Sequence, residues 1–421
     1  MNDRLPLMFV ACMTLCALLA PRAQAGLRLG DAPPSVVTTW NEIATTTINQ
    51  PAAAAGTPEE QRPIYGADLA SVHVAMHDAV AAITGTYKPL AVAARKAGGE
   101  ASQEAAATEA AYRVLLGLFP ARRASYQAAY ERMLQTVPEG PARQRGMDIG
   151  AEVAAGVLAW RAADGRSIVL PEYVPGQAPG QYRGKNPIGR MWPNIRPFAL
   201  TSNAQFRAPG PPALGSARYA QDFERTSQLG AAASTARKPE QTEIARFHSE
   251  PPFQFWPRNL RRLVAPGSSL ADQARLLALM WVTHADATHA CFESKYHYQF
   301  WRPMDAIALA DDDGNDATRT VPGWAPLLPT PPHPEYPAAH GCVTGALAAA
   351  LRGFYGRSDL AFDFSSTVTG STHHYESVDE LIQEVSFARI AGGMHFQSAV
   401  EDGERLGQQV ANWALAQKFK P

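Results

Sequence analysis

Apolar residues recur at helical spacing along most of the chain from Ser35 onward. Ala, Leu, Val and Ile return every three or four positions, with charged and amide residues between them. This spacing places the apolar side chains on one face of a helix. The pattern predicts helices over residues 68–80, 107–119, 124–135, 145–162 and 270–290, and a further one that begins near Tyr219. It favours an all-α fold.

One long segment interrupts the helical pattern. Residues 167–216 are rich in Pro, Gly and aromatic residues and show little periodicity. Proline fixes φ and removes a backbone donor, so sustained helices are not expected there. A loop of this length in a compact protein is usually functional or packed over another surface. We expect it to connect an N-terminal helical bundle over residues 26–166 with a C-terminal bundle over residues 217–421.

The N-terminal residues 1–25 have the pattern of a secretory signal peptide. Arg4 supplies the basic start, the run 5–20 is largely apolar, and Ala23 and Ala25 fit the cleavage rule. We expect a mature chain that begins at Gly26 and is exported, to the periplasm or outside the cell. No later apolar run is long enough to suggest a membrane span, so a soluble mature protein is expected.

Cysteine usage leaves one question open. Cys12 and Cys16 belong to the signal segment, and Cys291 and Cys342 remain in the mature chain. An exported protein permits a disulfide between them. Their distance does not follow from the sequence, and two buried thiols are an equal alternative.

Charge excludes some partners. The formal net charge is −1 and charged residues make up 18% of the chain, so nothing favours nucleic acid or an anionic membrane as a partner. The oligomeric state is left open.

Three short stretches near the C-terminal end carry fixed cations and histidines. They contain the cations Lys295, Arg302 and Arg389 and the histidines His340 and His395. A tetrahedral anion such as phosphate or vanadate needs several charge-assisted donors, a nucleophilic or ligating nitrogen and a proton carrier. The three stretches supply all of these groups and predict an oxyanion site.

Capping signals place the two histidines beside helix starts. Ser377 and Ser398 each precede a glutamate by three residues, as in a capping box, and Pro337 suits a first helical turn. These signals predict helices over residues 341–351, 378–391 and 399–417. Helix N-termini expose free backbone donors, so two of them are expected to converge on one anion.

The order and spacing of these stretches resemble the superfamily that joins vanadium-dependent haloperoxidases to type 2 phosphatidic-acid phosphatases. Its pattern reads K-x6-R-P, then P-S-G-H, then S-R-x3-G-x-H-x3-D. The first stretch and the cation and histidine of the third keep this spacing. Four positions depart from it, namely Ala338, Ala339, Ala388 and Ala399, which stand where the family has Ser, Gly, Ser and Asp.

The resemblance implies a role for each matching residue. His395 would bond vanadium, or attack phosphorus in a phosphatase, and His340 would be the acid–base histidine. The resemblance assigns oxyanion binding to Lys295, Arg302, Ala339, Arg389 and Gly393, with Ala339 acting through its backbone N–H. His333, seven residues before His340, matches a histidine that bromoperoxidase-like members place near bound peroxide. His333 and Trp301 are the candidate halide or peroxide site.

The implied function is oxidation of halide by hydrogen peroxide to hypohalous acid, with vanadate as cofactor and an organic acceptor as a further substrate. One alternative is an acid phosphatase with a phosphohistidine at His395. Another is a catalytically impaired oxyanion-binding protein, which the alanine substitutions suggest. Either Glu401 or Asp402 is a candidate to replace the carboxylate missing at Ala399.

Other polar residues have ordinary explanations. His73 and His77 are spaced as metal ligands on one helix face, but core packing is favoured. Asp286 and His289 either contact the cations or serve as polar groups in the core. His373 lies in a predicted polar loop and has no predicted role.

Overall fold

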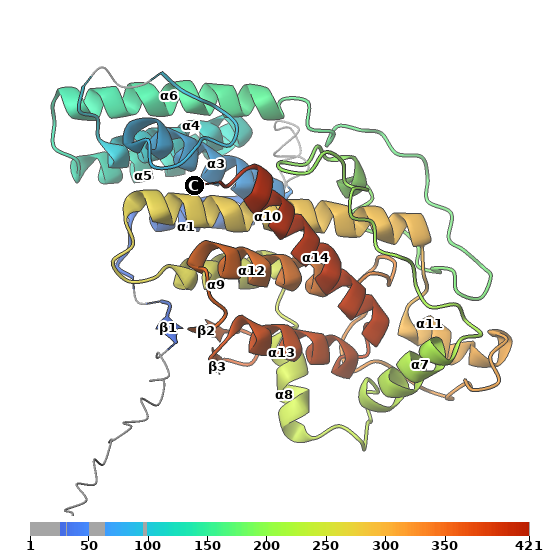
Figure 1. The fold of residues 1–421 in the computed structure, drawn as a ribbon. Coiled ribbons are helices and arrows are strands. Elements are labelled where there is room, and N and C mark those ends of the chain that lie inside the picture. The colour runs from blue at the N-terminus through green and yellow to red at the C-terminus, as the bar shows by residue number, and fades with distance from the viewer. Residues whose placement is uncertain (1–25, 31, 50–63, 96–98, 421) are drawn as a thin grey trace, which may run out of the picture.

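The computed structural model describes residues 26–30, 32–49, 64–95 and 99–420. The predicted signal peptide lies outside these residues. Helices dominate the described part (Figure 1). They are α1 (Val36–Ile48), α3 (Tyr65–Thr84), α4 (Gln103–Leu118), α5 (Arg123–Gln135), α6 (Pro141–Arg161), α7 (Ala217–Leu229), α8 (Pro239–Phe247), α9 (Pro252–Leu260), α10 (Leu270–Tyr298), α11 (Pro303–Ala308), α12 (Ala339–Tyr355), α13 (Val378–Ala391) and α14 (Gln397–Gln417). The expectation of an all-α fold is confirmed.

A small three-stranded sheet is the exception to the helical architecture. It comprises β1 (Leu27–Arg28), β2 (Leu360–Ser365) and β3 (Thr372–Tyr375), in that order, with β1 parallel and β3 antiparallel to β2. His373 lies in β3, so its placement in a polar loop was wrong. Its alternation with buried Tyr375 over so short a run is too brief a pattern to distinguish a strand from a loop.

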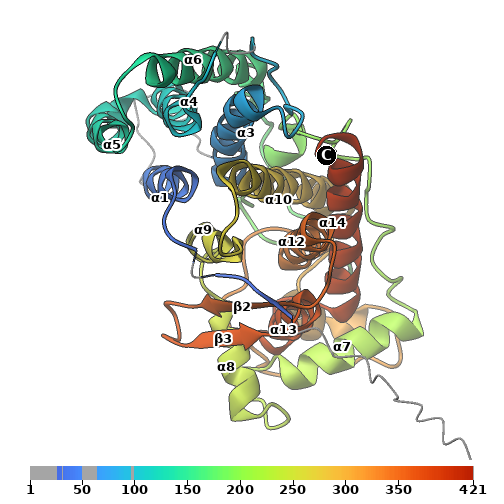
Figure 2. The same ribbon diagram turned by 60° about the vertical axis from the view of Figure 1, so that its left-hand side comes forward.

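The long helix α10 lies between two groups of helices (Figure 2). One group consists of α3, α4, α5 and α6, and the other consists of α12, α13 and α14. Helix α10 contacts α3 on one side and α12 and α14 on the other. Most of its residues are buried, which is why its apolar positions continue around the helix instead of forming one stripe. One apolar cluster contains residues of both groups, so they share a core. The division into two bundles stays a prediction.

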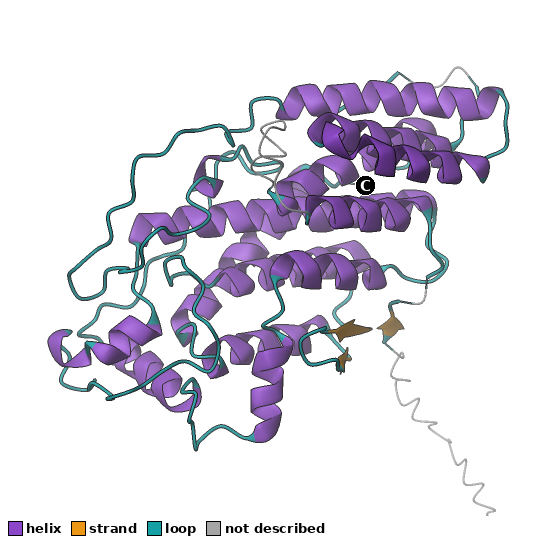
Figure 3. Cartoon of the chain, turned by 180° about the vertical axis from the view of Figure 1, so that it is seen from behind, coloured by secondary structure: helices purple, strands orange, loops and turns teal. Residues whose placement is uncertain are grey.

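The connecting segment 167–216 crosses the surface as an extended loop (Figure 3). It contains no α-helix and one short 3-10 turn, Trp192–Asn194. The buried carboxylate of Asp286 on α10 holds residues 198–200 of this segment, because the N–H groups of Phe198, Ala199 and Leu200 donate to it at 2.7, 2.7 and 3.1 Å. Asp286 therefore anchors the loop and does not contact the cations of the predicted site.

Close packing of α12 against α14 sets the position of two helix starts. A Cβ atom at Gly341 would lie 2.6 Å from the carbonyl oxygen of Val400, and one at Gly403 would lie 2.6 Å from that of Ala338. Only glycine permits this approach of the two backbones. As a result, the first turns of α12 and α14 lie side by side. The first turn of α12 carries His340, and His395 lies just before the first turn of α14.

Two predicted helix starts were wrong by two residues. Helix α14 begins at Gln397, so Ser398 lies inside it and is not its cap, and α12 begins at Ala339, so Pro337 lies before it. Helix α13 has the predicted bounds, and the Oγ atom of Ser377 caps it by accepting a bond from the N–H of Glu380. Within the described ranges, no helix is long and apolar enough to span a membrane.

Candidate active site

A cavity of about 470 Å³ opens beside the starts of α12 and α14. Its inner end is polar and carries four of the residues singled out from the sequence. These are His333, His340, Arg389 and His395. Ala339, the first residue of α12, also lines it. The cavity therefore brings together residues from the second and third stretches.

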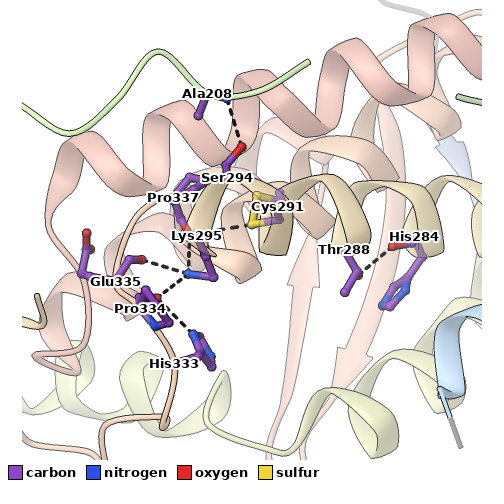
Figure 4. Close-up of a disulfide and its surroundings, with 11 residues drawn as sticks. Ala208, His284, Thr288, Cys291, Ser294, Lys295, His333, Pro334, Glu335 and Pro337 are labelled. Carbon is purple, nitrogen blue, oxygen red and sulfur yellow. Dashed lines mark hydrogen bonds between the residues drawn. A yellow bond between two sulfur atoms is a disulfide. The ribbon is translucent and has the colours of Figure 1, made fainter. Parts of the chain in front are cut away.

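The first stretch, which carries Lys295 and Arg302, is buried behind the residues that line the cavity. Lys295, in the last turn of α10, is fully buried and donates to the carbonyl oxygens of Pro334, Glu335 and Pro337 at 2.9, 2.9 and 2.5 Å (Figure 4). All three ammonium donors are therefore used by the segment that leads into α12. A direct contact between Lys295 and an anion would require these bonds to open, and that role stays a prediction.

A disulfide fixes the same region. Cys291 on α10 and Cys342 on α12 are bonded, with their Cα atoms 6.3 Å apart (Figure 4). The question left open by the sequence is answered in favour of the pair. The bond holds the start of α12 to the end of α10, one turn from Lys295.

Arg302 connects the two chain segments that carry His333 and His395 beside the cavity. Its Nε donates to the carbonyl oxygen of His333 at 2.8 Å, and its Nη1 donates to that of Met394 at 2.9 Å. Its Nη2 donates to the carbonyl oxygen of Pro331 at 3.1 Å and to Nδ1 of His333 at 2.9 Å. Arg302 is also buried outside the cavity wall. It fixes both histidine-bearing turns, and its predicted contact with an anion remains untested.

The protonation pattern of His395 follows from two neighbours. Nη1 of Arg302 lies 3.1 Å from Nε2 of His395 and can only donate, so Nε2 accepts. Burial, with the charges of Arg302 and Lys295, holds the pKa of His395 well below its usual value. The ring is therefore neutral and carries its proton on Nδ1, which donates to the Glu335 carboxylate at 3.0 Å. The lone pair of Nε2, which a ligand or nucleophile needs, accepts from Arg302, so a bond from Nε2 to an anion would require this hydrogen bond to open.

Glu335 was missed in the sequence. Its Oε1 accepts from Nδ1 of His395 and from the N–H of Phe396, each at 3.0 Å, while its buried Oε2 has no hydrogen-bond partner among the described residues. Burial raises its pKa to about 7, and the Phe396 N–H and Lys295 oppose the shift. An acidic residue inside the Pro-rich stretch before His340 was the available signal.

Neither acidic residue suggested as a replacement for the missing carboxylate takes that position. Glu401 pairs with Arg218 through an ion pair at 2.5 Å, and Asp402 accepts a bond from the hydroxyl of Tyr336 at 2.5 Å. Glu335 contacts His395 instead, from a segment that lies far away in the sequence.

Arg389 is the cation that faces the cavity. It lies in the last turn of α13, where Nη1 donates to the carbonyl oxygen of His248 at 3.0 Å and Nη2 lies 3.0 Å from Sδ of Met394. Its Nε is buried and has no hydrogen-bond partner in the described part of the chain. Burial and the charge of Arg302 lower its pKa to about 9. It therefore stays charged at neutral pH with an unused donor.

His340 and the start of α12 complete the inner end. Ala338 at the cap position makes no side-chain hydrogen bond, so the first backbone N–H groups of α12 have no cap. His340 lies in that first turn, and no hydrogen bond links its ring to another described residue. Burial, followed by the charge of Arg389, holds its pKa well below its usual value. The first turn of α12 thus offers backbone donors and a neutral imidazole.

The remaining predicted residues lie in different places. His333 lines the cavity, and its Nδ1 lies 2.9 Å from the donor Nη2 of Arg302 and 3.1 Å from the acceptor carbonyl oxygen of Pro334. Trp301 is fully buried and does not line the cavity. Gly393 has φ +73°, its N–H donates to the carbonyl oxygen of Ile390 at 2.9 Å, and it turns the chain toward His395. Roles for Trp301 and Gly393 in binding stay predictions.

The charge balance fits a tetrahedral oxyanion such as vanadate. Lys295 and Arg302 lie near one carboxylate, Glu335, whose pKa burial raises, and Arg389 is a third buried basic side chain of the site. Burial and the charge of Arg302 hold the pKa of Lys295 well below its usual value, while its three carbonyl acceptors favour the ammonium form. The unpartnered Nε of Arg389 and the uncapped start of α12 are free donors at the cavity wall. The bond between vanadium and Nε2 of His395 stays a prediction, and it would replace the hydrogen bond from Arg302. Arg389, His395 and the first turn of α12 would hold the anion, while Lys295 and Arg302 add positive charge from behind.

Comparisons with known proteins agree with this geometry. Residues 275–420 match the family described as the VCPO second helical-bundle domain. Over 95 residues the chain is 35% identical to a vanadium chloroperoxidase from Curvularia inaequalis, a match that spans 20% of this chain and 15% of that protein. This C-terminal region is therefore similar to a domain of vanadium haloperoxidases.

Solved structures show the same fold over most of the chain. A bacterial vanadium-dependent iodoperoxidase superposes with a TM-score of 0.72 at 23% identity, over 91% of this chain and 95% of that one. A bacterial vanadium-dependent chloroperoxidase in its apo form gives a TM-score of 0.64 at 16% identity, over 89% and 96%. At these identities the likeness concerns the fold, and the activity of this chain is argued from its own residues.

The structure confirms that His73 and His77 are packed in the core of the protein. Nε2 of His73 lies 3.0 Å from Oδ1 of Asn41, and Nε2 of His77 lies 3.2 Å from the carbonyl oxygen of Lys88. Both rings are buried in α3, and no cluster of three or more potential metal ligands exists among the described residues.

Proposed function

We propose that this protein is a vanadium-dependent haloperoxidase, which uses hydrogen peroxide to oxidise a halide to hypohalous acid. The observation that carries the proposal is the neutral His395 ring. Its Nε2 lone pair is fixed by Arg302 and Glu335 in the wall of a cavity whose charge balance favours an anion. The names of similarly folded structures, an iodoperoxidase and a chloroperoxidase, support the same activity.

Vanadate bound in this cavity would act as a Lewis acid that activates hydrogen peroxide without changing its own oxidation state. The chain's own residues hold it and manage protons. Glu335 keeps the proton of His395 on Nδ1, which leaves Nε2 as the ligating atom. The unused Nε donor of Arg389 and the N–H groups at the start of α12 stabilise negative charge.

We assign proton transfer to His340. Burial and the charge of Arg389 keep its pKa low in the free protein. A bound anion opposes that charge, so it favours the protonated imidazole and raises the pKa toward neutrality. His340 would then carry a proton only when the anion is present. His333 lies in the same cavity wall, and we assign it to the site for a halide or for peroxide.

An acid phosphatase is the second candidate, and the same lone pair supports it. Nε2 of His395 is equally suited to attack phosphorus, with His340 as the acid that protonates the leaving oxygen. The histidine in the cavity wall at position 333 favours the peroxidase, because a phosphatase has no evident use for that additional imidazole.

A paired assay on the purified protein separates these functions. One arm measures oxidation of bromide and iodide with vanadate and hydrogen peroxide, and the other measures hydrolysis of α-naphthyl phosphate without vanadate. Oxidation without hydrolysis is expected. Hydrolysis alone identifies the phosphatase, and the absence of both activities identifies an oxyanion-binding protein.

We also propose that the protein is exported. The disulfide between Cys291 and Cys342 supports this, because such bonds persist mainly in oxidising compartments. N-terminal sequencing of the exported protein is expected to begin at Gly26. A chain that retains Met1 and stays in the cytoplasm would contradict the proposal.

A further inference from the structure

The cavity has two ends of different chemistry. The inner end carries the three histidines and Arg389, whereas aromatic side chains line the walls that lead outward. The aromatic wall consists of Tyr65, Trp192, Phe253, Trp256 and Phe292, contributed by α3, the connecting segment, α9 and α10. Phe253 is 39% exposed and marks the mouth, whereas Phe292 is 3% exposed and lies beside His333, with ring centroids 5.1 Å apart. The aromatic wall therefore reaches from solvent to the polar end.

The volume exceeds what the oxyanion, a halide and peroxide require together. Cavities that enclose drug-sized organic molecules typically measure about 300–1,000 Å³, and this one measures about 470 Å³. No Asp, Glu or Lys lines it among the described residues, and its charged side chain, Arg389, lies at the inner end. A neutral organic molecule suits the outer part, because no carboxylate of the described residues is present there to pair with a cation and the charge of Arg389 repels one.

The arrangement of the rings favours a flat aromatic occupant. The rings of Trp192 and Phe292 meet edge to face with centroids 4.3 Å apart, and those of Tyr65 and Phe253 meet at 68° with centroids 6.4 Å apart. The connecting segment contributes Trp192, and α9 contributes Phe253, so two separate elements border the space. Aromatic rings pack favourably in such edge-to-face and offset contacts.

We propose that this outer part of the cavity binds a neutral, electron-rich aromatic molecule as the halogen acceptor. The proposal rests on the proposed haloperoxidase activity and names its organic substrate class. Halogen is transferred while the acceptor is bound, so its orientation in the cavity selects the position that reacts. For bromide the balance is ArH + Br⁻ + H₂O₂ + H⁺ → ArBr + 2 H₂O. Bromide loses two electrons to the peroxide O–O bond, a C–Br bond replaces a C–H bond, and the released proton passes to water.

The first test is binding in the absence of vanadate and peroxide, with α-naphthol as the probe in equilibrium dialysis. We expect saturable binding that Phe253→Asp and Trp192→Ala each weaken by about tenfold or more, because each change removes apolar contact from one wall. The matched control is Val368→Asp, at a residue that is 51% exposed and lies outside the cavity. It should bind like the parent. Absence of saturation, or equal affinity in all four proteins, would overturn the proposed binding site.

The second test is the ratio of ortho- to para-brominated α-naphthol. The parent is expected to give a ratio different from that of hypobromite added to the same buffer, and Phe253→Asp should move it toward the hypobromite value. A parent ratio equal to that of hypobromite would overturn transfer within the cavity. If bromide is not oxidised at all, the proposed function fails, while the dialysis result still decides whether the cavity is an aromatic site. Hydrolysis of α-naphthyl phosphate would then identify the aromatic group as the leaving group of a phosphate ester.

Discussion

The Nδ1 atom of His395 donates a hydrogen bond to the carboxylate of Glu335 across 3.0 Å, with both side chains buried. Glu335 lies in the segment before α12 and His395 in the turn before α14, so this bond ties the two helix starts that border the cavity. It also places the lone pair of the ring on the other nitrogen, Nε2, which accepts from Arg302. Position 399, where the superfamily pattern has Asp, is Ala in this chain, and the carboxylate that contacts His395 comes from a different segment.

Glu335→Gln tests this positioning role. The amide keeps an acceptor for the Nδ1–H but removes the negative charge that supports His395 as a ligand. Loss of such a supporting partner typically reduces activity by about 10–100-fold. The affinity for sulfate, a tetrahedral anion that needs no bond to His395, is expected not to fall. Steady-state kinetics and calorimetry provide the two readouts.

The control for this variant is Glu404→Gln. Glu404 is a partly buried glutamate of α14 outside the cavity, and burial raises its pKa to about 7 as well. Its turnover should match that of the parent. A parallel loss of turnover and sulfate affinity in Glu335→Gln would show a general distortion of the site and contradict the positioning role.

Arg389 is expected to provide the largest side-chain contribution to anion binding from the cavity wall. Arg389→Ala should weaken sulfate or vanadate binding by about 1.5–3 kcal/mol, roughly ten- to a hundredfold or more. Arg389→Lys should recover part of this, because the planar fork is lost. Arg237→Ala is the control, since Arg237 also donates to buried carbonyl oxygens but lies outside the cavity wall. Calorimetric affinities within about twofold of the parent for Arg389→Ala would remove it from the site.

Arg302→Ala should affect both stability and binding. It leaves the carbonyl oxygens of Pro331, His333 and Met394 without their guanidinium donor. Each buried acceptor left unpaired costs about 1–3 kcal/mol, so the free energy of unfolding should fall by several kcal/mol. Anion affinity should fall with it, because positive charge near His395 is lost. Denaturant unfolding at the parent's stability would contradict the assignment of Arg302 as the residue that holds these turns together.

A pH effect on stability is expected from His373 in β3. Its ring forms ion pairs with Glu384 at 2.8 Å and Glu243 at 2.9 Å. Burial opposes protonation, but hydrogen bonding to Glu384 and the two carboxylate charges outweigh it and raise the pKa of His373. The stabilisation is therefore complete below the unfolded-state pKa and is lost as pH rises through the folded-state value. Its size should not exceed about 1 kcal/mol, since the group is partly exposed.

The free energy of unfolding, measured with denaturant from below the unfolded-state pKa of histidine, about 6.5, to above the raised folded-state pKa of His373, checks the effect. His373→Gln should remove the pH-dependent part, whereas His297→Gln, at an exposed histidine, should leave it unchanged. An unchanged pH dependence in His373→Gln would rule out His373 as its source.

Local signals in the sequence predicted the fold well where local contacts determine it. Ser377 caps α13 through a neighbouring N–H, and both bounds of that helix were correct. The start of α14 was wrong because distant residues satisfy its N–H groups. The N–H of Phe396 donates to Glu335 at 3.0 Å, and that of Ser398 lies 3.3 Å from Oδ2 of Asp222. Ser398 was therefore not needed as a cap.

The candidate site likewise has features that the local sequence predicted and features that depend on contacts between distant segments. The motif spacing identified the residue types, and four of them meet at the inner end of one cavity. It did not indicate that the donors of Lys295 end on backbone carbonyl oxygens or that Glu335 reaches His395, because both contacts join segments far apart in the chain. The aromatic wall was equally inaccessible, since its residues come from separate elements and follow no common spacing.

The most direct test of the account is vanadium NMR of vanadate with the parent protein, His340→Ala and His395→Ala. In the proposed function His395 ligates vanadium through Nε2, so the parent and His340→Ala should both show a protein-bound signal. His340→Ala should lose turnover by about 10²–10⁴-fold, as expected for an acid–base group. His395→Ala should show only weakly held, freely exchanging vanadate. A protein-bound signal in His395→Ala like that of the parent would contradict the assignment of His395 as the vanadium ligand.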